Sequence, residues 1–156
     1  MPLAPVLGTW CSRIGTRVPV VDASVVVDWV APDADPDGPA RRLLKRLARS
    51  DATVLAPRLM LEEVSNALLS GVRRQRWDGA AADNAFQLLM ALPVKIADMP
   101  GDLERAWDLS RRYDEHPVCD MLYVAVAERM GEQMITADER LRTRLIGRDL
   151  VVGLDD

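Results

Sequence analysis

The segment VPVVDASVVVDWV, residues 18–30, begins with a short apolar run that ends in an acid, Asp22. An apolar run of this length is typical of a strand buried in a parallel sheet. The part from Ser24 to Val30 is compatible with a short helix. The segment therefore predicts the first strand–helix unit of an alternating chain, with a carboxylate where the strand ends.

The same alternation continues outward from this segment. Further strands are predicted at 53–56, 94–97, 133–136 and 150–152, and helices at 40–49, 58–75, 79–92, 102–113, 120–130 and 138–145. In the helix at 79–92, Phe86, Leu89 and Met90 are the expected core residues. Such alternation predicts an α/β fold with three layers, α/β/α, around a mostly parallel sheet of four to five strands.

Length and composition favour one folded domain. The chain has 156 residues, of which 49% are apolar and 28% charged, which excludes wholesale disorder. We expect the domain to span residues 18–156, and residues 1–17 to be a loose arm or the result of a start codon placed too far upstream. No apolar run reaches membrane-spanning length. Cys11 and Cys119 form no CxxC pair, which favours a reducing, cytoplasmic location.

The net charge of −4 does not indicate a protein that binds polyanions through overall charge. Basic residues nevertheless gather in three runs, and local patches of this kind can attract phosphates. Solvated helix faces are an equally good interpretation of any single run. The runs comprise Arg41, Arg42, Lys45, Arg46 and Arg49; Arg73, Arg74 and Arg76; and Arg140, Arg142, Arg144 and Arg148.

Four acids fall at positions that a parallel sheet brings together. Asp22 ends the first strand, Asp138 follows the fourth, and Asp120 begins a helix. The carboxyl ends of parallel strands form the edge where open α/β sheets bind their ligands. Glu63 lies on the helix after the second strand, beside its apolar stripe. We therefore expect all four carboxylates in one pocket.

Clustered carboxylates repel one another unless some are protonated or a cation lies between them. Oxygen ligands favour Mg²⁺ or Mn²⁺ over zinc, and one histidine without a cysteine pair makes a typical zinc site difficult to build. Bound Mg²⁺ can orient a water for attack on a phosphodiester, and a neighbouring carboxylate can take the proton. The pattern predicts one or two such ions, bound by Asp22, Glu63, Asp120 and Asp138.

Each acid also has a simpler explanation. Asp22 and Asp138 could cap helices, Asp120 could complement a helix dipole, and Glu63 could be an exposed helix residue. Glu62 is a rival to Glu63 for the inward position.

Three other residue types have competing interpretations. His116, the only histidine, could shuttle a proton near Asp120, but a structural hydrogen bond is the favoured interpretation. Cys119 is expected to be a small packing residue rather than a nucleophile. The tryptophans are expected in the core or at an interface; they include Trp29, Trp77 and Trp107.

Four short motifs resemble those of PIN-domain nucleases, and most closely the VapC toxins of bacterial toxin–antitoxin pairs. They are VVDASVV at 20–26, PRLMLEEVSNAL at 57–68, DMLYVAVA at 120–127 and TADERL at 136–141. Their order and spacing match the family, and the similarity runs from about Val20 to the C-terminus. The spacing of Glu63 to Asn66 favours Glu63 over Glu62. Cys119 and the His116-Pro117 pair depart from the family pattern without removing an acid.

The resemblance implies a PIN-like fold and an endoribonuclease that depends on Mg²⁺ or Mn²⁺ and cleaves RNA to restrain growth. Asp22, Glu63, Asp120 and Asp138 match the family's acidic positions, and Ser24, Asn66 and Thr136 match polar positions that support or border the site. It also implies a homodimer and a cognate antitoxin bound in a groove near the active site. The basic helix at 40–49 would then line an RNA path or flank that groove.

Two alternatives belong to other classes of protein. A catalytically silent PIN-like module that binds RNA or protein would keep the fold, but the intact acid set argues against it. An aspartyl-phosphate enzyme or a signalling receiver also places an acid after its first strand. Ser24 occupies the position where the phosphatase needs a second acid, and no lysine follows Lys95 where a receiver needs one.

Overall fold

The protein is described by a computed structural model that covers residues 18–145 and 149–155. Residues 1–17, for which we predict a loose arm or a misplaced start, lie outside the described residues, as do 146–148 and 156.

A parallel sheet of five strands forms the centre of the molecule. The strands are β1 (Val20–Val21), β2 (Val54–Ala56), β3 (Val94–Ile96), β4 (Met134–Ile135) and β5 (Val151–Val152). Their order is β3-β2-β1-β4-β5, and every neighbouring pair is parallel. The chain thus moves from β1 outward to β3, then crosses back to β4 on the other side of β1. The direction of the crossovers reverses between β1 and β4.

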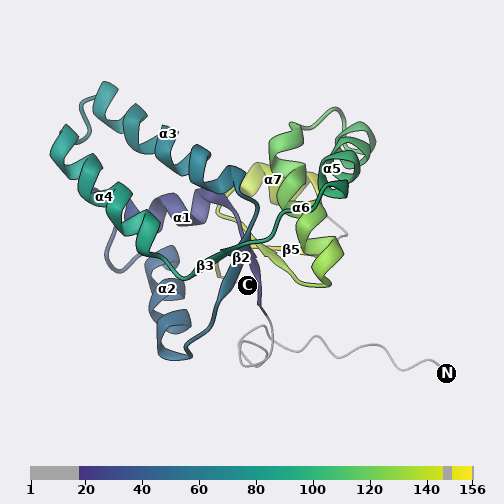
Figure 1. The fold of residues 1–156 in the computed structure, drawn as a ribbon, viewed down its shortest axis with the longest axis horizontal. Helices are drawn as coiled ribbons and strands as arrows, with labels where there is room; N and C mark the ends of the chain where they lie inside the picture. The colour runs from purple at the N-terminus through teal and green to yellow at the C-terminus, as the bar shows by residue number, and fades with distance from the viewer. Residues whose placement is uncertain (1–17, 146–148, 156) are drawn as a thin grey trace.

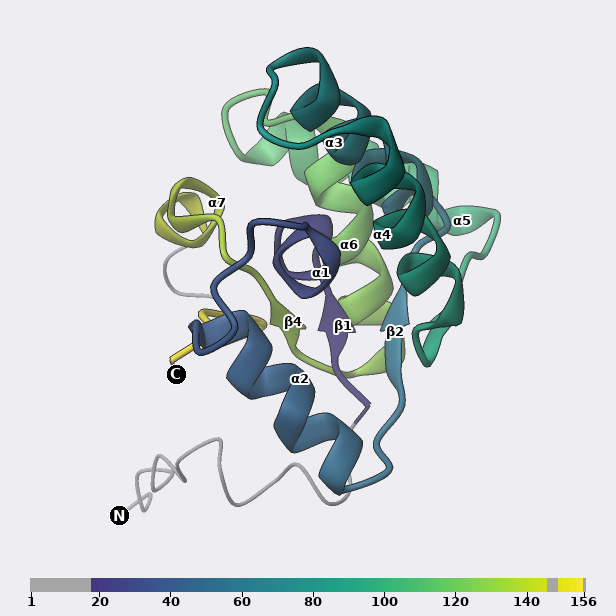
Figure 2. The ribbon, with the colours of Figure 1, turned by 90° about the vertical axis from the view of Figure 1, so that its left-hand side faces the viewer.

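Helices cover both faces of this sheet, as predicted (Figure 1). One layer contains α1 (Ala23–Val30), α2 (Pro39–Arg49), α3 (Leu59–Arg73) and α4 (Gly79–Ala91). The other contains α5 (Gly101–Arg112), α6 (Val118–Met130) and α7 (Glu139–Arg144). Figure 2 shows the first layer from its outer side, with α1 between α2 and α3. The predicted elements all occur, with ends that differ by a few residues.

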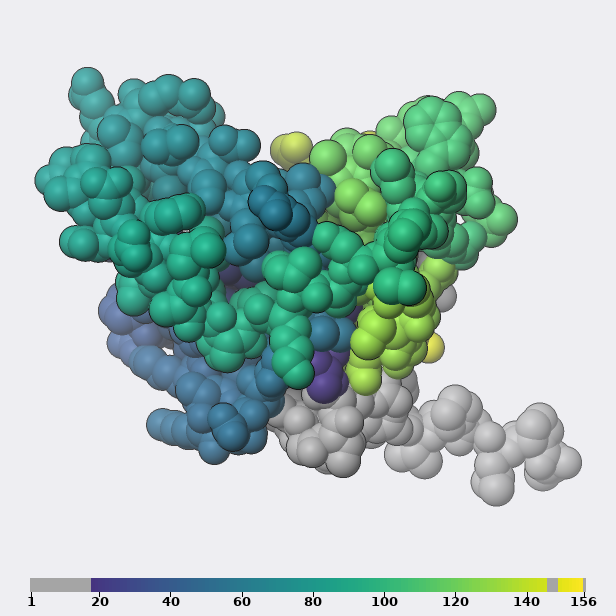
Figure 3. Space-filling model, viewed as in Figure 1, coloured from purple at the N-terminus to yellow at the C-terminus, as the bar shows by residue number. Residues whose placement is uncertain are grey.

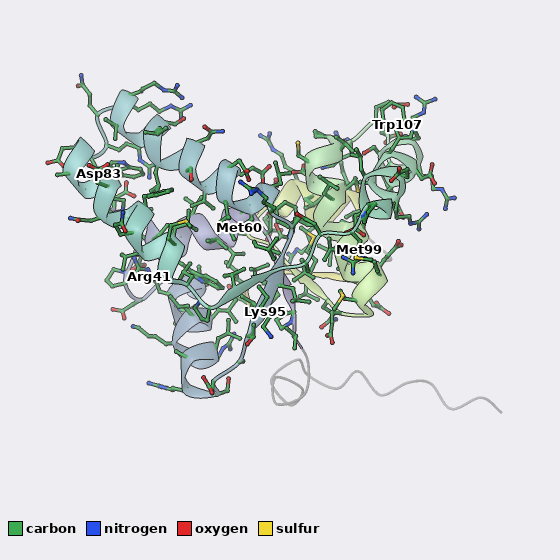
Figure 4. All side chains as sticks on the ribbon, in the orientation of Figure 1. Arg41, Met60, Asp83, Lys95, Met99 and Trp107 are labelled. Carbon is green, nitrogen blue, oxygen red and sulfur yellow. The ribbon has the colours of Figure 1, made fainter. Side chains whose placement is uncertain are left out.

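The core lies where α1, α3 and α6 meet the sheet. Val20 and Val21 are fully buried, as expected for a central strand, and Met60 and Tyr123 are fully buried on the two helical layers. Figure 4 shows Met60 at the centre of the molecule. In α4, Leu89 is buried as predicted. Phe86 and Met90 are exposed, so their assignment to the core was wrong: the stripe that α4 turns inward is Ala82, Ala85 and Leu89.

The tryptophans fall into different environments. Trp29 is buried and its Nε1–H donates to the carbonyl of Ala40 over 2.8 Å, which joins α1 to α2. Trp77 is partly buried, and its Nε1–H donates to the carbonyl of Leu68. Trp107, in the middle of α5, is 62% exposed at the periphery of the molecule (Figure 4), so the core interpretation fails there.

Within the part of the chain that the structure describes, no helix is both long and apolar enough to cross a membrane.

Candidate active site

Asp22 follows β1 directly and is buried at the start of α1. Its backbone is extended, with φ −75° and ψ 152°, and its N–H donates to the carbonyl of Ile135 at the end of β4. Its side chain makes no capping bond to α1. Instead Oδ2 accepts from the hydroxyls of Ser24, over 2.6 Å, and Thr136, over 2.8 Å. The capping interpretation of Asp22 therefore fails, and the carboxylate points toward β4.

Ser24 and Thr136 connect the ends of the two central strands. The Ser24 hydroxyl accepts from the N–H of Ala137, and the Thr136 hydroxyl accepts from the N–H of Asp138. Both hydroxyls donate to Asp22, and their oxygens are 3.4 Å apart. Ser24 and Thr136 thus hold the first acid in a defined orientation, in the supporting position that the resemblance implied.

Glu63 enters from α3 and contacts α6. The hydroxyl of Tyr123 donates to Glu63 Oε2 over 2.5 Å, across 60 residues of sequence. Glu62 is exposed and pairs with Arg58 on the outer face of α3 over 3.1 Å. The structure therefore decides between the two glutamates: Glu63 faces inward and Glu62 faces solvent.

Asp120 lies in the first turn of α6, and its side chain is 31% exposed. Its Oδ2 is 2.7 Å from Nε2 of His116, one helical turn before it. The imidazole is buried, so the favoured interpretation of His116 as a structural hydrogen-bonding residue is confirmed. The contact holds Asp120 from the side of the α5–α6 loop.

Electrostatic coupling joins three of the acids. Burial raises the pKa of Asp22, and the negative charge of Asp120 raises it further, whereas the Ser24 and Thr136 hydroxyls act in the opposite direction. Burial also raises the pKa of Glu63; the Tyr123 hydroxyl lowers it, and the charges of Asp22 and Asp120 raise it. The charges of these acids thus act on one another, and Tyr123 joins Glu63 to α6, the helix that carries Asp120, near the crossover reversal beside β1. We call Asp22, Glu63 and Asp120 the acidic pocket.

Asp138 stands apart from that group. It is the N-cap of α7, and its Oδ1 accepts from the N–H groups of Arg140, over 2.8 Å, and Leu141, over 3.3 Å. Its link to Asp22 runs through its own N–H and the Thr136 hydroxyl. The capping interpretation thus holds for Asp138, and its second carboxylate oxygen is the one left for another ligand.

Asn66 is separate too. It is exposed and lines a hollow of about 350 Å³ between α3 and α4, with Leu61, Ser65, Phe86 and Met90 among its neighbours. Among the described residues, no hydrogen bond or ion pair joins the Asn66 side chain to Asp22, Glu63 or Asp120.

The donor set can be compared with what a divalent cation needs. Among residues 18–145 and 149–155, no three acid, histidine or cysteine side chains are arranged so that they could already hold a metal ion. Mg²⁺, however, keeps several waters and needs only one or two carboxylates. Oxygen-only donors fit such an ion, and so do the raised pKa values of Asp22 and Glu63, which come first from burial and then from neighbouring carboxylates. The residues present therefore suit Mg²⁺ or Mn²⁺.

Two features of the site go beyond the predicted residues. Tyr123 was part of a motif but had no assigned role. Burial and the Glu63 carboxylate raise its phenol pKa well above the ordinary value, so it stays a hydrogen-bond donor. Its position three residues after Asp120, on the same helix face, is the signal that could have identified it. Cys119 is exposed, which corrects its assignment as a packing residue. Burial and the charges of Glu63 and Asp120 raise its thiol pKa, which disfavours a nucleophile.

The fold and the site together define a class: a parallel α/β domain with an acidic pocket where its crossovers reverse. The PIN domain profile matches residues 20–144. Ribonuclease VapC3 of Mycobacterium tuberculosis is 37% identical over 122 residues, which are 78% of this chain and 83% of the relative. Ribonuclease VapC9 of the same species and VapC ribonuclease Mb0985 of Mycobacterium bovis are each 30% identical over 78% of this chain and 87% of the relative. The chain therefore belongs to the PIN domain family and is of the VapC type.

Proposed function

We propose that this protein is an endoribonuclease that depends on Mg²⁺ or Mn²⁺ and serves as the toxin of a toxin–antitoxin pair. The observation that carries the proposal is the placement of three acids near the carboxyl end of β1: Asp22 is held by Ser24 and Thr136, and Glu63 is bonded to Tyr123 on α6, the helix that carries Asp120. The relatives named ribonuclease VapC3 and ribonuclease VapC9 support the same activity.

Asp22, Glu63 and Asp120 would hold the cation, with the free oxygen of Asp138 as a further donor. The cation would stabilise the negative charge that develops on the phosphate. The surface is hollowed between α3 and the α5–α6 layer (Figure 3), which gives a substrate a side of approach.

The protein's own residues orient these acids. Ser24 and Thr136 hold Asp22, Tyr123 holds Glu63, and His116 holds Asp120, each through one direct hydrogen bond. A carboxylate with a raised pKa is a better proton acceptor than an ordinary one. Glu63 is half-buried and has such a pKa, so we assign it the proton of the attacking water.

The partners follow from the family. We propose that a cognate antitoxin covers the hollow between α3 and α4, where Phe86 and Met90 present exposed apolar surface. We also expect a homodimer and a cytoplasmic location. Light scattering on the purified protein measures its oligomeric state, and fractionation of cells measures its location.

Cleavage of RNA tests the proposal. Wild type should cut RNA when Mg²⁺ or Mn²⁺ is added and lose the activity in EDTA, and Asp22→Asn and Asp120→Asn should each be inactive. Full cleavage by both variants, or cleavage that persists in EDTA, would refute it. Binding of RNA without cleavage across a broad panel would favour the silent binding module. Mapping of cleavage ends in total RNA then identifies the target.

A further inference from the structure

Four basic side chains line one face of α2. Their spacing of three, four and seven residues places them on a single side of the helix, over about 10 Å of its axis. Together with Pro39, Leu154 and Asp155 they border a hollow of about 390 Å³. We call this set the α2 basic stripe: Arg42, Lys45, Arg46 and Arg49.

The stripe is not a wall of the acidic pocket. Arg49 ends α2 a few residues before β2 begins at Val54, so this end lies at the amino edge of the parallel sheet. Asp22 lies at the opposite, carboxyl edge. α1 lies between α2 and α3, the helix that carries Glu63 (Figure 2). A ligand on the stripe therefore occupies a different surface from a phosphodiester held by the acids.

Carboxylates neutralise Arg42 and Lys45 only weakly. Arg42 pairs with Asp155 and Lys45 with Asp37, each over 3.5 Å. The side chains of both pairs are more than half exposed. Exposed pairs of this kind contribute about 1 kcal/mol or less. A phosphate group can replace either carboxylate at little cost in free energy, because it is also negatively charged and has more acceptor oxygens.

The chemistry of the surface favours nucleic acid over protein. Protein interfaces have an apolar centre, whereas nucleic-acid interfaces are polar and positively charged. The large apolar residues of α2 turn inward: Leu43 and Leu47 are buried. Among the described residues, α2 has no exposed large apolar side chain; the first one in sequence order is Leu69 on α3.

We propose that the α2 basic stripe binds the phosphate backbone of RNA outside the few nucleotides at the acidic pocket. The choice of RNA as the polyanion rests on the proposed function. The stripe makes the enzyme prefer RNA that is long enough to reach both surfaces. It contributes to binding and not to the chemical step.

A charge reversal with a matched control tests the stripe. The test variant is Lys45→Glu with Arg49→Glu. The control is Arg73→Glu with Arg74→Glu, which makes the same charge change at the end of α3, and all four residues are exposed. Circular dichroism on each variant checks that it is folded.

The first readout is binding of a single-stranded RNA of about 20 nucleotides, followed by fluorescence anisotropy in EDTA. The test variant should raise Kd about tenfold and lower the slope of log K against log salt by about 1.4, because each lost phosphate contact contributes about 0.7. The control should change Kd less than about twofold. Equal losses in both variants would show a net-charge effect and overturn the proposal, as would no binding by wild type.

The second readout is cleavage of the same RNA and of a short one of about six nucleotides, with Mg²⁺ present. The test variant should lower the ratio of long to short kcat/KM about tenfold, through KM. An unchanged ratio would overturn the proposal that the stripe binds RNA, whereas the proposed cleavage activity would still hold. If wild type cut neither RNA, the proposed function would fail, and the anisotropy result would still decide whether the stripe binds RNA.

Discussion

The acidic pocket and the α2 basic stripe differ in how their charges are held. Each acid of the pocket has a hydrogen-bonding partner on the same or another element, such as Thr136 for Asp22 and Tyr123 for Glu63. In the stripe, Arg42 and Lys45 have exposed side chains in weak surface ion pairs. Chemistry requires atoms in a fixed geometry, whereas attraction of phosphates requires only charge at a surface. The pocket should therefore respond to neutral replacements in kcat, and the stripe to charge changes in KM.

Asp22→Asn should give the largest effect. The amide keeps an oxygen that can accept from Ser24 and Thr136, but it removes the negative charge. We expect kcat to fall by about 10³-fold with little change in RNA affinity, because loss of one charge-stabilising group costs roughly that much. Single-turnover cleavage and anisotropy measure the two quantities. A change in Kd as large as that of the stripe variant would break the distinction between the two regions.

The neighbouring glutamates offer a matched pair. Glu63→Gln removes the inward carboxylate, whereas Glu62→Gln removes an exposed one that pairs with Arg58. We expect about a 10²-fold loss of kcat for the first, as for other general bases, and less than about a twofold loss for the second. Equal losses, measured in one cleavage assay, would show that the inward position of Glu63 has no catalytic consequence.

Asp138 tests how far the acidic pocket extends. Asp138→Asn can still cap α7, whereas Asp138→Ala cannot. Removal of the cap should lower the free energy of unfolding by about 1 kcal/mol in the alanine variant only. Urea unfolding measures this difference. Loss of cleavage in the asparagine variant would mean that the carboxylate acts in catalysis, and retained cleavage would reduce Asp138 to a cap.

The pH dependence of stability gives the smallest effect. The folded-state pKa of Asp22 is raised above its ordinary value, so wild type loses stability as pH rises from 3.8 to the folded pKa, where the cost of the buried charge is complete. In EDTA, Asp22→Asn should therefore be more stable than wild type at neutral pH. Its advantage should shrink as pH falls toward the ordinary value of 3.8. Urea unfolding at several pH values measures the difference in free energy of unfolding between variant and wild type. A difference that grows on acidification would contradict the prediction.

Local sequence patterns predicted most helices and strands of this molecule, but they predicted less well which side of a helix is exposed. The strand–helix alternation and the acid of the first motif are visible in short windows, because period and propensity act over a few residues. Phe86 and Met90 show the limit. Both are apolar on a helix, but the inward stripe of α4 consists of Ala82, Ala85 and Leu89. Helical period alone leaves such a choice open when apolar residues occur on more than one face.

The sequence by itself determined the order of the elements, the parallel sheet and the oxygen-only acids at its carboxyl edge. Only the tertiary structure decided that Glu63 rather than Glu62 faces inward, that the Asp22 carboxylate bonds to Thr136 instead of capping α1, and that α2 lies away from the pocket. The contacts responsible join residues 60 and 114 positions apart, Glu63 with Tyr123 and Asp22 with Thr136. Such pairs form only when strand order and helix packing bring their elements together, and no short window of sequence contains that information.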